Sequence, residues 1–289
     1  PRVAFNMDKF FKRACACGKQ ALTMCMGFGC NAAGVVGCRI IESPRERLIA
    51  TITNNFVPCN GRFPTLIAII TMFFVAAAAG PFQSVFAALL LVGIILVGIV
   101  MTLLVSRLLS KTILKGMPSS FTLELPPYRR PQVGKIIVRS IFDRTLFVLG
   151  RAVMVAAPAG LVIWVLANIQ AGDLSLLAHC ANFFDPFARL IGLDGFILMA
   201  FILGFPANEI VVPIAMMSYL SQGAMAEVQS LAAMGEILRA NGWTWMTALS
   251  VMLFSLLHFP CGTTVFTVLK ETGSRKWAFI SFVLPTLVA

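Results

Sequence analysis

The chain has 289 residues, of which 58% are hydrophobic and only 12% are charged, with a mean hydropathy of +0.88. About a quarter of the residues of an ordinary soluble domain are charged, so this composition excludes a disordered chain and a typical soluble enzyme. It favours a helical protein that crosses a membrane several times, because one soluble core cannot bury so many apolar side chains. The net charge of +11 comes from 23 basic and 12 acidic residues. These charges flank long apolar runs, which is typical of cytoplasmic loops and argues against nucleic-acid binding.

Three apolar runs are long enough to cross the core of a bilayer, which is about 30 Å thick: 84–106, 147–170 and 244–269. A fourth run, 64–80, is near the lower length limit for a span. The last run, Trp277–Ala289, is too short to cross. Because the chain also starts at Pro1 rather than Met, we expect it to be a piece of a longer protein, cut at both ends.

The basic residues orient these spans, because short cytoplasmic loops are rich in Lys and Arg. Nine basic side chains lie between Arg107 and Arg151, so the loop 107–146 is predicted to be cytoplasmic. The same rule places 1–19, 39–63 and 270–276 inside, and 171–194 and 221–243 outside. Two apolar stretches, 20–38 and 195–220, then have both ends on one side. Each is therefore predicted to turn back within the membrane.

Both of these stretches contain the same short pattern, Gly-Phe-x-x-Asn. It covers Gly27–Asn31 in the first stretch and Gly204–Asn208 in the second. Each is followed by a second helix breaker with a cysteine, which is Pro58–Cys59 in one half and Pro260–Cys261 in the other. Interrupted hydrophobic segments at corresponding places in two halves are the sequence feature that best points to the binding site of a transporter. The sequence therefore predicts two inverted repeats, each with broken helices.

These motifs resemble the membrane domain of the ferrous iron transport protein B (FeoB) family, in their residues and in their order. The resemblance rests on Gly27–Asn31, Pro44–Arg47, Phe56–Pro64, Glu124–Pro131, Gly204–Glu209 and Pro260–Cys261. It covers nearly the whole chain. The chain departs from the usual family pattern at Ala32–Gly34, Thr65–Leu66 and Asn208.

The resemblance implies an all-α, polytopic membrane fold with two inverted Gate repeats. The first repeat is expected over 1–116, a cytoplasmic or interfacial connector with the motif ELPPYRRP over 117–140, and the second repeat over 141–289. It also implies transport of Fe²⁺ into the cell, through the pore part of a GTPase-coupled transporter in a bacterial or archaeal cytoplasmic membrane. The GTPase domain, with its GTP and Mg²⁺, would lie upstream of Pro1. This stretch is therefore expected to be no enzyme and to have no catalytic or cofactor-binding residues.

Three cysteines beside helix breakers are the leading candidates for metal ligands: Cys30, Cys59 and Cys261. Freed carbonyls and half-helix ends can join a binding site at such breaks, and a thiolate suits a borderline transition metal better than it suits sodium or magnesium. A free cysteine otherwise behaves as a small buried hydrophobe. This second interpretation is preferred for the other five: Cys15, Cys17, Cys25, Cys38 and Cys180.

Glu209 is the strongest single candidate on physical grounds, because an ionisable residue inside an apolar stretch is expensive and is by default a functional hypothesis. It could bind Fe²⁺ directly, carry a proton, or pair with a buried cation such as Arg62. Asn31 and Asn208 are secondary candidates, which could offer amide oxygens or equally cap the broken helices. His258, three residues before the last cysteine, is a further candidate, although a hydrogen-bonded core histidine is the preferred interpretation.

The expected partners are membrane lipid and the upstream GTPase domain, with small cytoplasmic accessory proteins and a homo-oligomer as further expectations; no nucleic acid is expected. Two alternative functions stay open. A Gate-type carrier of a nucleoside or other small solute would present polar and aromatic groups at the breakers rather than cysteines. A regulatory membrane module without a pathway would need neither paired broken helices nor a glutamate within an apolar stretch.

Overall fold

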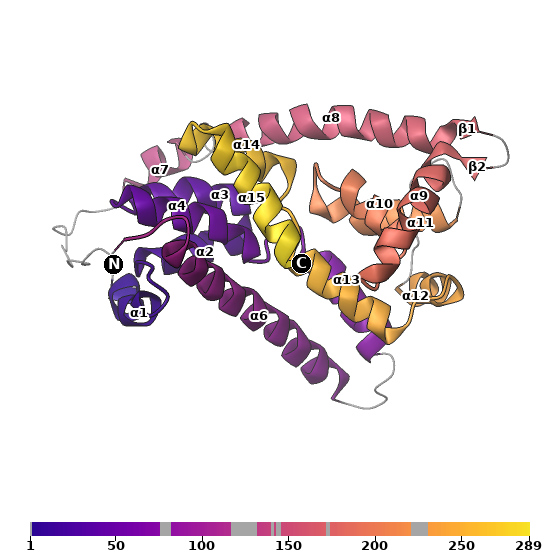
Figure 1. The fold of residues 1–289 in the computed structure, drawn as a ribbon, viewed down its shortest axis with the longest axis horizontal. Coiled ribbons are helices and arrows are strands. Elements are labelled where there is room, and N and C mark those ends of the chain that lie inside the picture. Colours follow the sequence, from indigo (N-terminus) through magenta and orange to yellow (C-terminus); the bar gives the residue numbers. More distant parts are fainter. Residues whose placement is uncertain are drawn as a thin grey trace.

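Helices make up nearly all the regular structure of the chain, so the all-α prediction is confirmed (Figure 1). The computed structural model describes residues 2–75, 82–116, 132–139, 142, 146–171, 174–220 and 231–289. Within these ranges the only strands are two-residue segments, β1 (Gln170–Ala171) and β2 (Leu174–Ser175), which pair antiparallel.

The first part of the chain forms short helices at one end of the molecule. They are α1 (Arg2–Lys12), α2 (Lys19–Gly29), α3 (Asn31–Gly37), the 3₁₀ helix η1 (Cys38–Ile40), α4 (Pro44–Thr53) and the 3₁₀ helix η2 (Asn54–Phe56). The Asn54 amide fits between α2 and α3, where its Nδ2 donates to the Asn31 carbonyl at 3.1 Å. A Cβ atom on Gly27 or Gly34 would lie within 2.7 Å of that amide, so both positions require glycine.

The predicted span 84–106 is confirmed as α6 (Gln83–Lys111), a 29-residue helix with many exposed apolar side chains. Before it, α5 (Phe63–Ile69) continues as a π-helical turn, η3 (Ile70–Val75). The remainder of the predicted run 64–80 lies outside the described residues.

Most of the predicted connector also lies outside the described residues, which continue shortly before α7 (Val133–Arg139). The proposed domain boundaries at 116 and 140 therefore stay a prediction. Helix α8 (Phe147–Asn168) follows and covers the predicted apolar run 147–170 except its last two residues.

The segment 171–194 was predicted to lie outside, and its side of the membrane stays a prediction. It contains α9 (Leu176–Leu190), which turns by 107° into α10 (Gly195–Leu203). Of the acidic residues that suggested an outer position, two lie on this amphipathic helix or shortly after it: Asp185 pairs with Arg189 at 2.7 Å, and Asp194 caps α10. This part of the chain continues with η5 (Asn208–Ile210), α11 (Val211–Tyr219) and α12 (Leu231–Ala240).

The sharp bend between α9 and α10 predicts a strong effect of Gly195→Ala. A Cβ atom there would lie 2.0 Å from the Ala181 carbonyl oxygen, which is backbone and cannot rotate away. We expect the full-length protein in detergent to lose about 1–3 kcal/mol of stability, seen as a lower thermal unfolding midpoint. Gly93→Ala in α6 is the matched control, because a Cβ atom added there would meet no other atom within 4 Å. Equal midpoints for the two variants would contradict this packing.

The predicted span 244–269 is found as two helices, α13 (Trp245–Leu257) and α14 (Gly262–Thr272), separated by an extended break. Together, residues Trp245–Thr272 are long and apolar enough to cross a membrane, as is α6, and the bent pair α9 and α10 would make a third such span. The last helix is α15 (Arg275–Val288), which includes the short apolar run expected there.

The segment 39–63, which was predicted to lie on the inner side, is mostly helical and largely buried. Ile52 and Phe56 lie in a core with Leu109 of α6, and Arg62 is completely buried. The charge of Arg62 therefore says nothing about which side of the membrane this segment faces. The other arginines of the segment, at positions 39, 45 and 47, precede the buried part.

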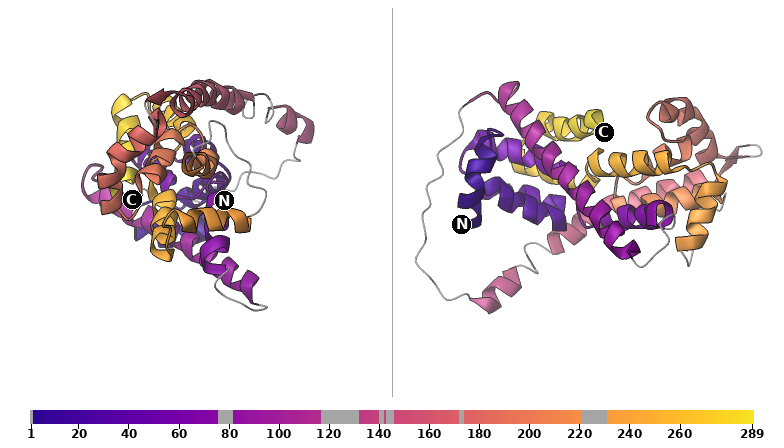
Figure 2. Two further views of the ribbon diagram at one scale, coloured as in Figure 1. Left: turned by 90° about the vertical axis from the view of Figure 1, so that its right-hand side faces the viewer. Right: turned by 90° about the horizontal axis from the view of Figure 1, so that it is seen from below.

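The helices form two ends joined by a middle layer. In Figure 1, α1–α4 lie at one end and α9–α12 at the other, with α6, α13 and α15 between them and α8 running along one side. The view from below in Figure 2 shows the same separation of the two ends. The largest core cluster lies at the α9–α12 end, where α5, η3 and α13 also contribute buried side chains such as Ile69 and Val251.

Candidate functional site

The two Gly-Phe-x-x-Asn motifs break their helices in the same way. Cys30 ends α2 and starts α3 in an extended conformation with φ −154° and ψ 124°. Ala207, at the corresponding position of the second motif, has φ −152° and ψ 120°. The internal repeat seen in the sequence is thus a repeat of backbone geometry. The asparagines that follow, Asn31 and Asn208, are both buried.

Hydrogen bonds join each of these breaks to the Pro-Cys break of its own half. The Asn60 N–H donates to the Gly29 carbonyl at 3.4 Å, next to Cys30. In the other half, the Gly262 N–H donates to the Phe205 carbonyl at 2.7 Å, next to Cys261. The four breaks therefore form two directly bonded pairs.

Arg62 connects the two halves. Its guanidinium Nη1 donates to the carbonyls of Asn55 at 3.1 Å and Leu256 at 2.8 Å, and Nη2 donates to those of His258 and Phe259, each at 3.2 Å. Three of these carbonyls belong to the end of α13 and the break after it. From the sequence, Arg62 was considered as a partner for Glu209, whereas in the structure its guanidinium binds these backbone carbonyls.

The three candidate cysteines lie at these breaks. Cys30 and Cys261 are the residues from which α3 and α14 start, and those two helices pack side by side. The bond from Arg62 to the Phe259 carbonyl brings the Cys59 break next to the Cys261 break, as the bond from Asn60 to Gly29 brings it next to Cys30. The Sγ of Cys261 lies 3.2 Å from the Thr264 hydroxyl. Cys59 is buried, and the other two are partly exposed. The structure thus gathers all three thiols in one region.

Glu209 also belongs to this region, because a Cβ atom on Gly61 would lie 2.9 Å from its Oε1. The carboxylate therefore comes next to the break that contains Cys59. Its side chain is exposed rather than buried, which differs from the expectation of a charge hidden in an apolar stretch. Because the Glu209 carboxylate is exposed and lies beside two breaks, it can meet an incoming cation.

The secondary candidates have different surroundings. The Asn31 amide, with its nitrogen facing the carbonyls, donates to Val57 and Gly27 at 3.1 Å each, so it holds the first break together. The Oδ1 of Asn208 is buried and has no hydrogen-bond partner among the described residues. His258 is buried, its Nδ1 lies 2.9 Å from the Phe254 carbonyl, and its ring packs among phenylalanines, as expected of a core histidine. Within the part of the chain that the structure describes, no three His, Cys, Asp or Glu side chains converge closely enough to hold a metal ion.

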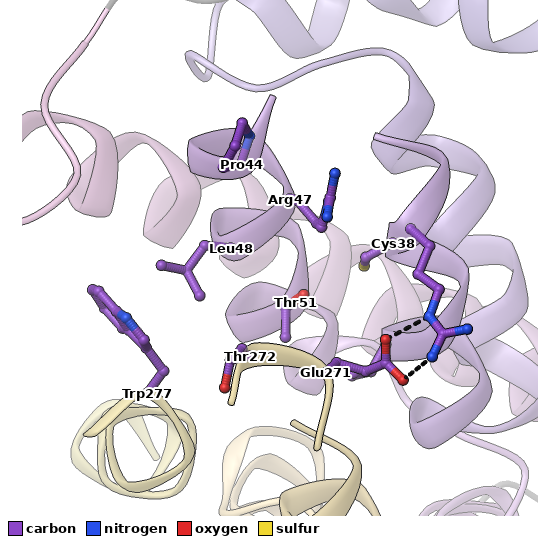
Figure 3. Close-up of a pocket in the computed structure, with 10 residues that line it drawn as sticks. Cys38, Pro44, Arg47, Leu48, Thr51, Glu271, Thr272 and Trp277 are labelled. Carbon is purple, nitrogen blue, oxygen red and sulfur yellow. Dashed lines mark hydrogen bonds and ion pairs between the residues drawn. The ribbon is translucent and has the colours of Figure 1, made fainter. Parts of the chain in front are cut away.

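A cavity of about 580 Å³ lies at the other ends of α3 and α14 (Figure 3). Helix α4 lines it with Pro44, Arg47, Leu48 and Thr51, and α14 and α15 line it with Glu271, Thr272 and Trp277. Arg39 binds the Glu271 carboxylate through two hydrogen bonds of 2.6 and 2.7 Å at its edge. These two residues are 232 positions apart, so their ion pair joins the two halves of the chain.

Comparison with known proteins decides the family. The Gate family model, described as "Nucleoside recognition", matches residues 1–74 and 149–275, which is well over half of the chain. The chain belongs to the Gate family. A second model, described as "Ferrous iron transport protein B C terminus", matches residues 91–143 of this Gate protein, between the two Gate segments.

Curated relatives agree with both models. The Gate protein is 30% identical over its whole length to the Fe(2+) transporter FeoB of Staphylococcus aureus (strain MSSA476), covering 42% of that protein. It is 25% identical over its whole length to the Fe(2+) transporter FeoB of Leptospira interrogans, covering 44%. A fusion of Fe(2+) transport protein A with the Fe(2+) transporter FeoB from Porphyromonas gingivalis is 27% identical over 98% of the chain, which covers 38% of the fusion. The chain therefore spans about two fifths of the length of these relatives. No solved structure matches it.

These matches confirm the resemblance to the membrane portion of FeoB, and with the apolar helices they make this Gate protein a multi-pass protein of the cytoplasmic membrane. Two features of the site were not predicted from the sequence. One is the role of Arg62 at the centre of the breaks, and the other is the Arg39–Glu271 pair. The sequence did contain a signal for the role of Arg62, because a basic residue stands three positions after the Pro58–Cys59 break. No sequence pattern pointed to the second.

Proposed function

We propose that this chain forms the path by which Fe²⁺ enters the cell in a FeoB-type transporter. The observation that carries the proposal is the gathering of four helix breaks, with Cys30, Cys59 and Cys261, in a chain similar to proteins named Fe(2+) transporters. Thiolate ligands suit Fe²⁺ better than they suit the more abundant hard cations. Broken helices supply the irregular backbone that such a path needs inside a membrane.

Glu209 and the cysteines have different roles in this path. The exposed carboxylate of Glu209, beside Gly61, attracts the cation to the breaks. The thiols of Cys59 and Cys261 then bind it, with the Oδ1 of Asn208 as a further acceptor. Conduction requires binding that is strong enough for the ion to enter and weak enough for it to leave, so a series of partial sites suits transport.

The cavity in Figure 3 is the exit of the path in this proposal. It lies at the ends of α3 and α14 opposite the cysteines, and the basic residues around it favour the cytoplasmic side. The Arg39–Glu271 pair lies at its edge and joins the two halves, so relative movement of the halves would open or close the exit.

The GTPase domain, its GTP and Mg²⁺, and the small accessory proteins belong to the longer protein in this proposal. The relative that is fused to Fe(2+) transport protein A supports an accessory protein of that type as a partner. The surrounding lipid contacts the exposed apolar face of α6.

The experiment that tests this function is uptake by the full-length protein in sealed lipid vesicles. We expect radioactive Fe²⁺, kept reduced, to accumulate in vesicles with the protein and not in empty vesicles. Uptake of a labelled nucleoside instead of iron would favour the Gate-type solute carrier. Uptake of neither would favour a regulatory membrane module and would contradict the proposal.

A further inference from the structure

Arg62 is the most buried charged residue described in the chain, with 0% of its surface exposed. A buried charge is costly unless it is paired, and the usual partner is a carboxylate. None of the four salt bridges of the described residues includes Arg62. Four backbone carbonyls surround its guanidinium instead. The positive charge of Arg62 is therefore balanced by backbone carbonyls and not by a carboxylate.

The carbonyls around Arg62 are ones that the helix break has released. The Leu256 carbonyl would normally accept a hydrogen bond from the N–H of residue 260, but that residue is a proline and has none. The carbonyls of His258 and Phe259 lie in the extended break after α13. These groups also lie at the C-terminal end of a helix, where the helix dipole adds partial negative charge.

In transporters with broken helices, released carbonyls and half-helix C-terminal ends are the groups that coordinate a coupling Na⁺ or proton. Here a guanidinium occupies the released carbonyls. We propose that Arg62 is a built-in cation, which takes the place of an alkali coupling ion at this break. The charge is covalently attached, so it fixes the break permanently and leaves no site for Na⁺ or K⁺ among these carbonyls.

The position of Arg62 makes this arrangement relevant to the metal path. It lies three residues after Cys59, and the His258 and Phe259 carbonyls that it binds belong to residues three and two positions before Cys261. One side chain therefore fixes both Pro-Cys breaks relative to each other. Arg62 is a positioning residue for these two thiols, and it is not itself a metal ligand.

The first test uses the unmodified full-length protein in vesicles. We expect Fe²⁺ uptake to change less than about twofold when N-methylglucamine replaces Na⁺ and K⁺ on both sides, since the guanidinium already occupies the carbonyls that either ion would need. A requirement for Na⁺ or K⁺ would overturn the proposal. This first test rests on the proposed function, because it needs measurable iron uptake by the wild-type protein.

The second test is chemical rescue of Arg62→Ala with free guanidinium ion. We expect the substitution to lower uptake by roughly tenfold or more, as loss of supporting residues around metal ligands commonly does, and millimolar guanidinium to restore it severalfold. Arg239→Ala is the matched control, because Arg239 also donates to a backbone carbonyl, that of Met72, but lies in α12 and lines neither the breaks nor the cavity. Uptake by Arg239→Ala should not respond to guanidinium, and an equal response would overturn the proposal.

A third measurement does not depend on transport. In purified Arg62→Ala, low guanidinium concentrations should raise the thermal unfolding midpoint, whereas the same concentrations should not raise that of the wild type. The absence of a shift in the variant would overturn the proposal. If wild-type vesicles take up no iron, the proposed function fails while this measurement still decides the role of Arg62. If the variant cannot be purified, the cation-replacement arm on the wild type decides it.

Discussion

Replacing Cys59 and Cys261 together by serine in the full-length protein should lower Fe²⁺ uptake by at least about tenfold, the scale on which metal sites respond to changes around the metal. Serine keeps the size and hydrogen bonding of the side chain but removes the soft sulfur that favours Fe²⁺. Residue 261 can still face Thr264 through a hydroxyl, so the local structure should survive. Uptake of radioactive iron into vesicles, normalised to the amount of inserted protein, measures the effect.

The matched control is Cys180→Ser. Cys180 is partly exposed, as Cys261 is, and lies in a helix, α9, at the end of the molecule opposite α1–α4 (Figure 1). Its substitution should leave uptake within about twofold of the wild type, because surface changes are usually small in effect. If Cys180→Ser lowers uptake as much as the double substitution does, thiols act through general stability and the site assignment is wrong.

Replacing Glu209 by glutamine should raise the iron concentration needed for half-maximal uptake by about tenfold, while the maximal rate changes less. The reason is that an exposed carboxylate beside the breaks increases the local cation concentration without having to hold the ion. The effect should shrink at high ionic strength, because salt screens an exposed charge. Initial uptake rates over a range of iron concentrations, at low and high salt, measure it.

Glu236→Gln is the control for this prediction. Glu236 is an exposed carboxylate in α12, at the end of the molecule opposite α1–α4, so it tests whether any loss of negative charge has the same result. We expect no change in half-saturation for this variant. A drop in maximal rate for Glu209→Gln at unchanged half-saturation would instead favour direct ligation or proton transfer by Glu209.

The breaks could be predicted because glycine and proline act on the backbone directly. Gly-Phe-x-x-Asn and Pro-Cys are local signals, and Cys30 and Ala207 have almost the same dihedral angles in the structure. Pro260 removes a helical N–H whatever surrounds it. These features therefore needed no knowledge of tertiary contacts.

The structure of the segments between the spans could not be predicted from their charges. Counting charges assumes that each one faces water, but Arg62 is bound by carbonyls inside the protein and Asp194 caps a helix. The count therefore gave no sign that 39–63 is largely buried or that 171–194 contains an amphipathic helix. The convergence of the four breaks could not be predicted either, since it depends on contacts such as Asn60 with Gly29 and Gly262 with Phe205.

The most direct test of the central claim is X-ray absorption at the iron edge of the full-length protein loaded with Fe²⁺ under anaerobic conditions. We predict sulfur in the first coordination shell of the bound iron, at a distance near the ~2.3 Å typical of metal–thiolate bonds. This sulfur shell should disappear when Cys30, Cys59 and Cys261 are replaced by serine. Iron bound to the wild type with only oxygen and nitrogen neighbours would contradict a path lined by these cysteines.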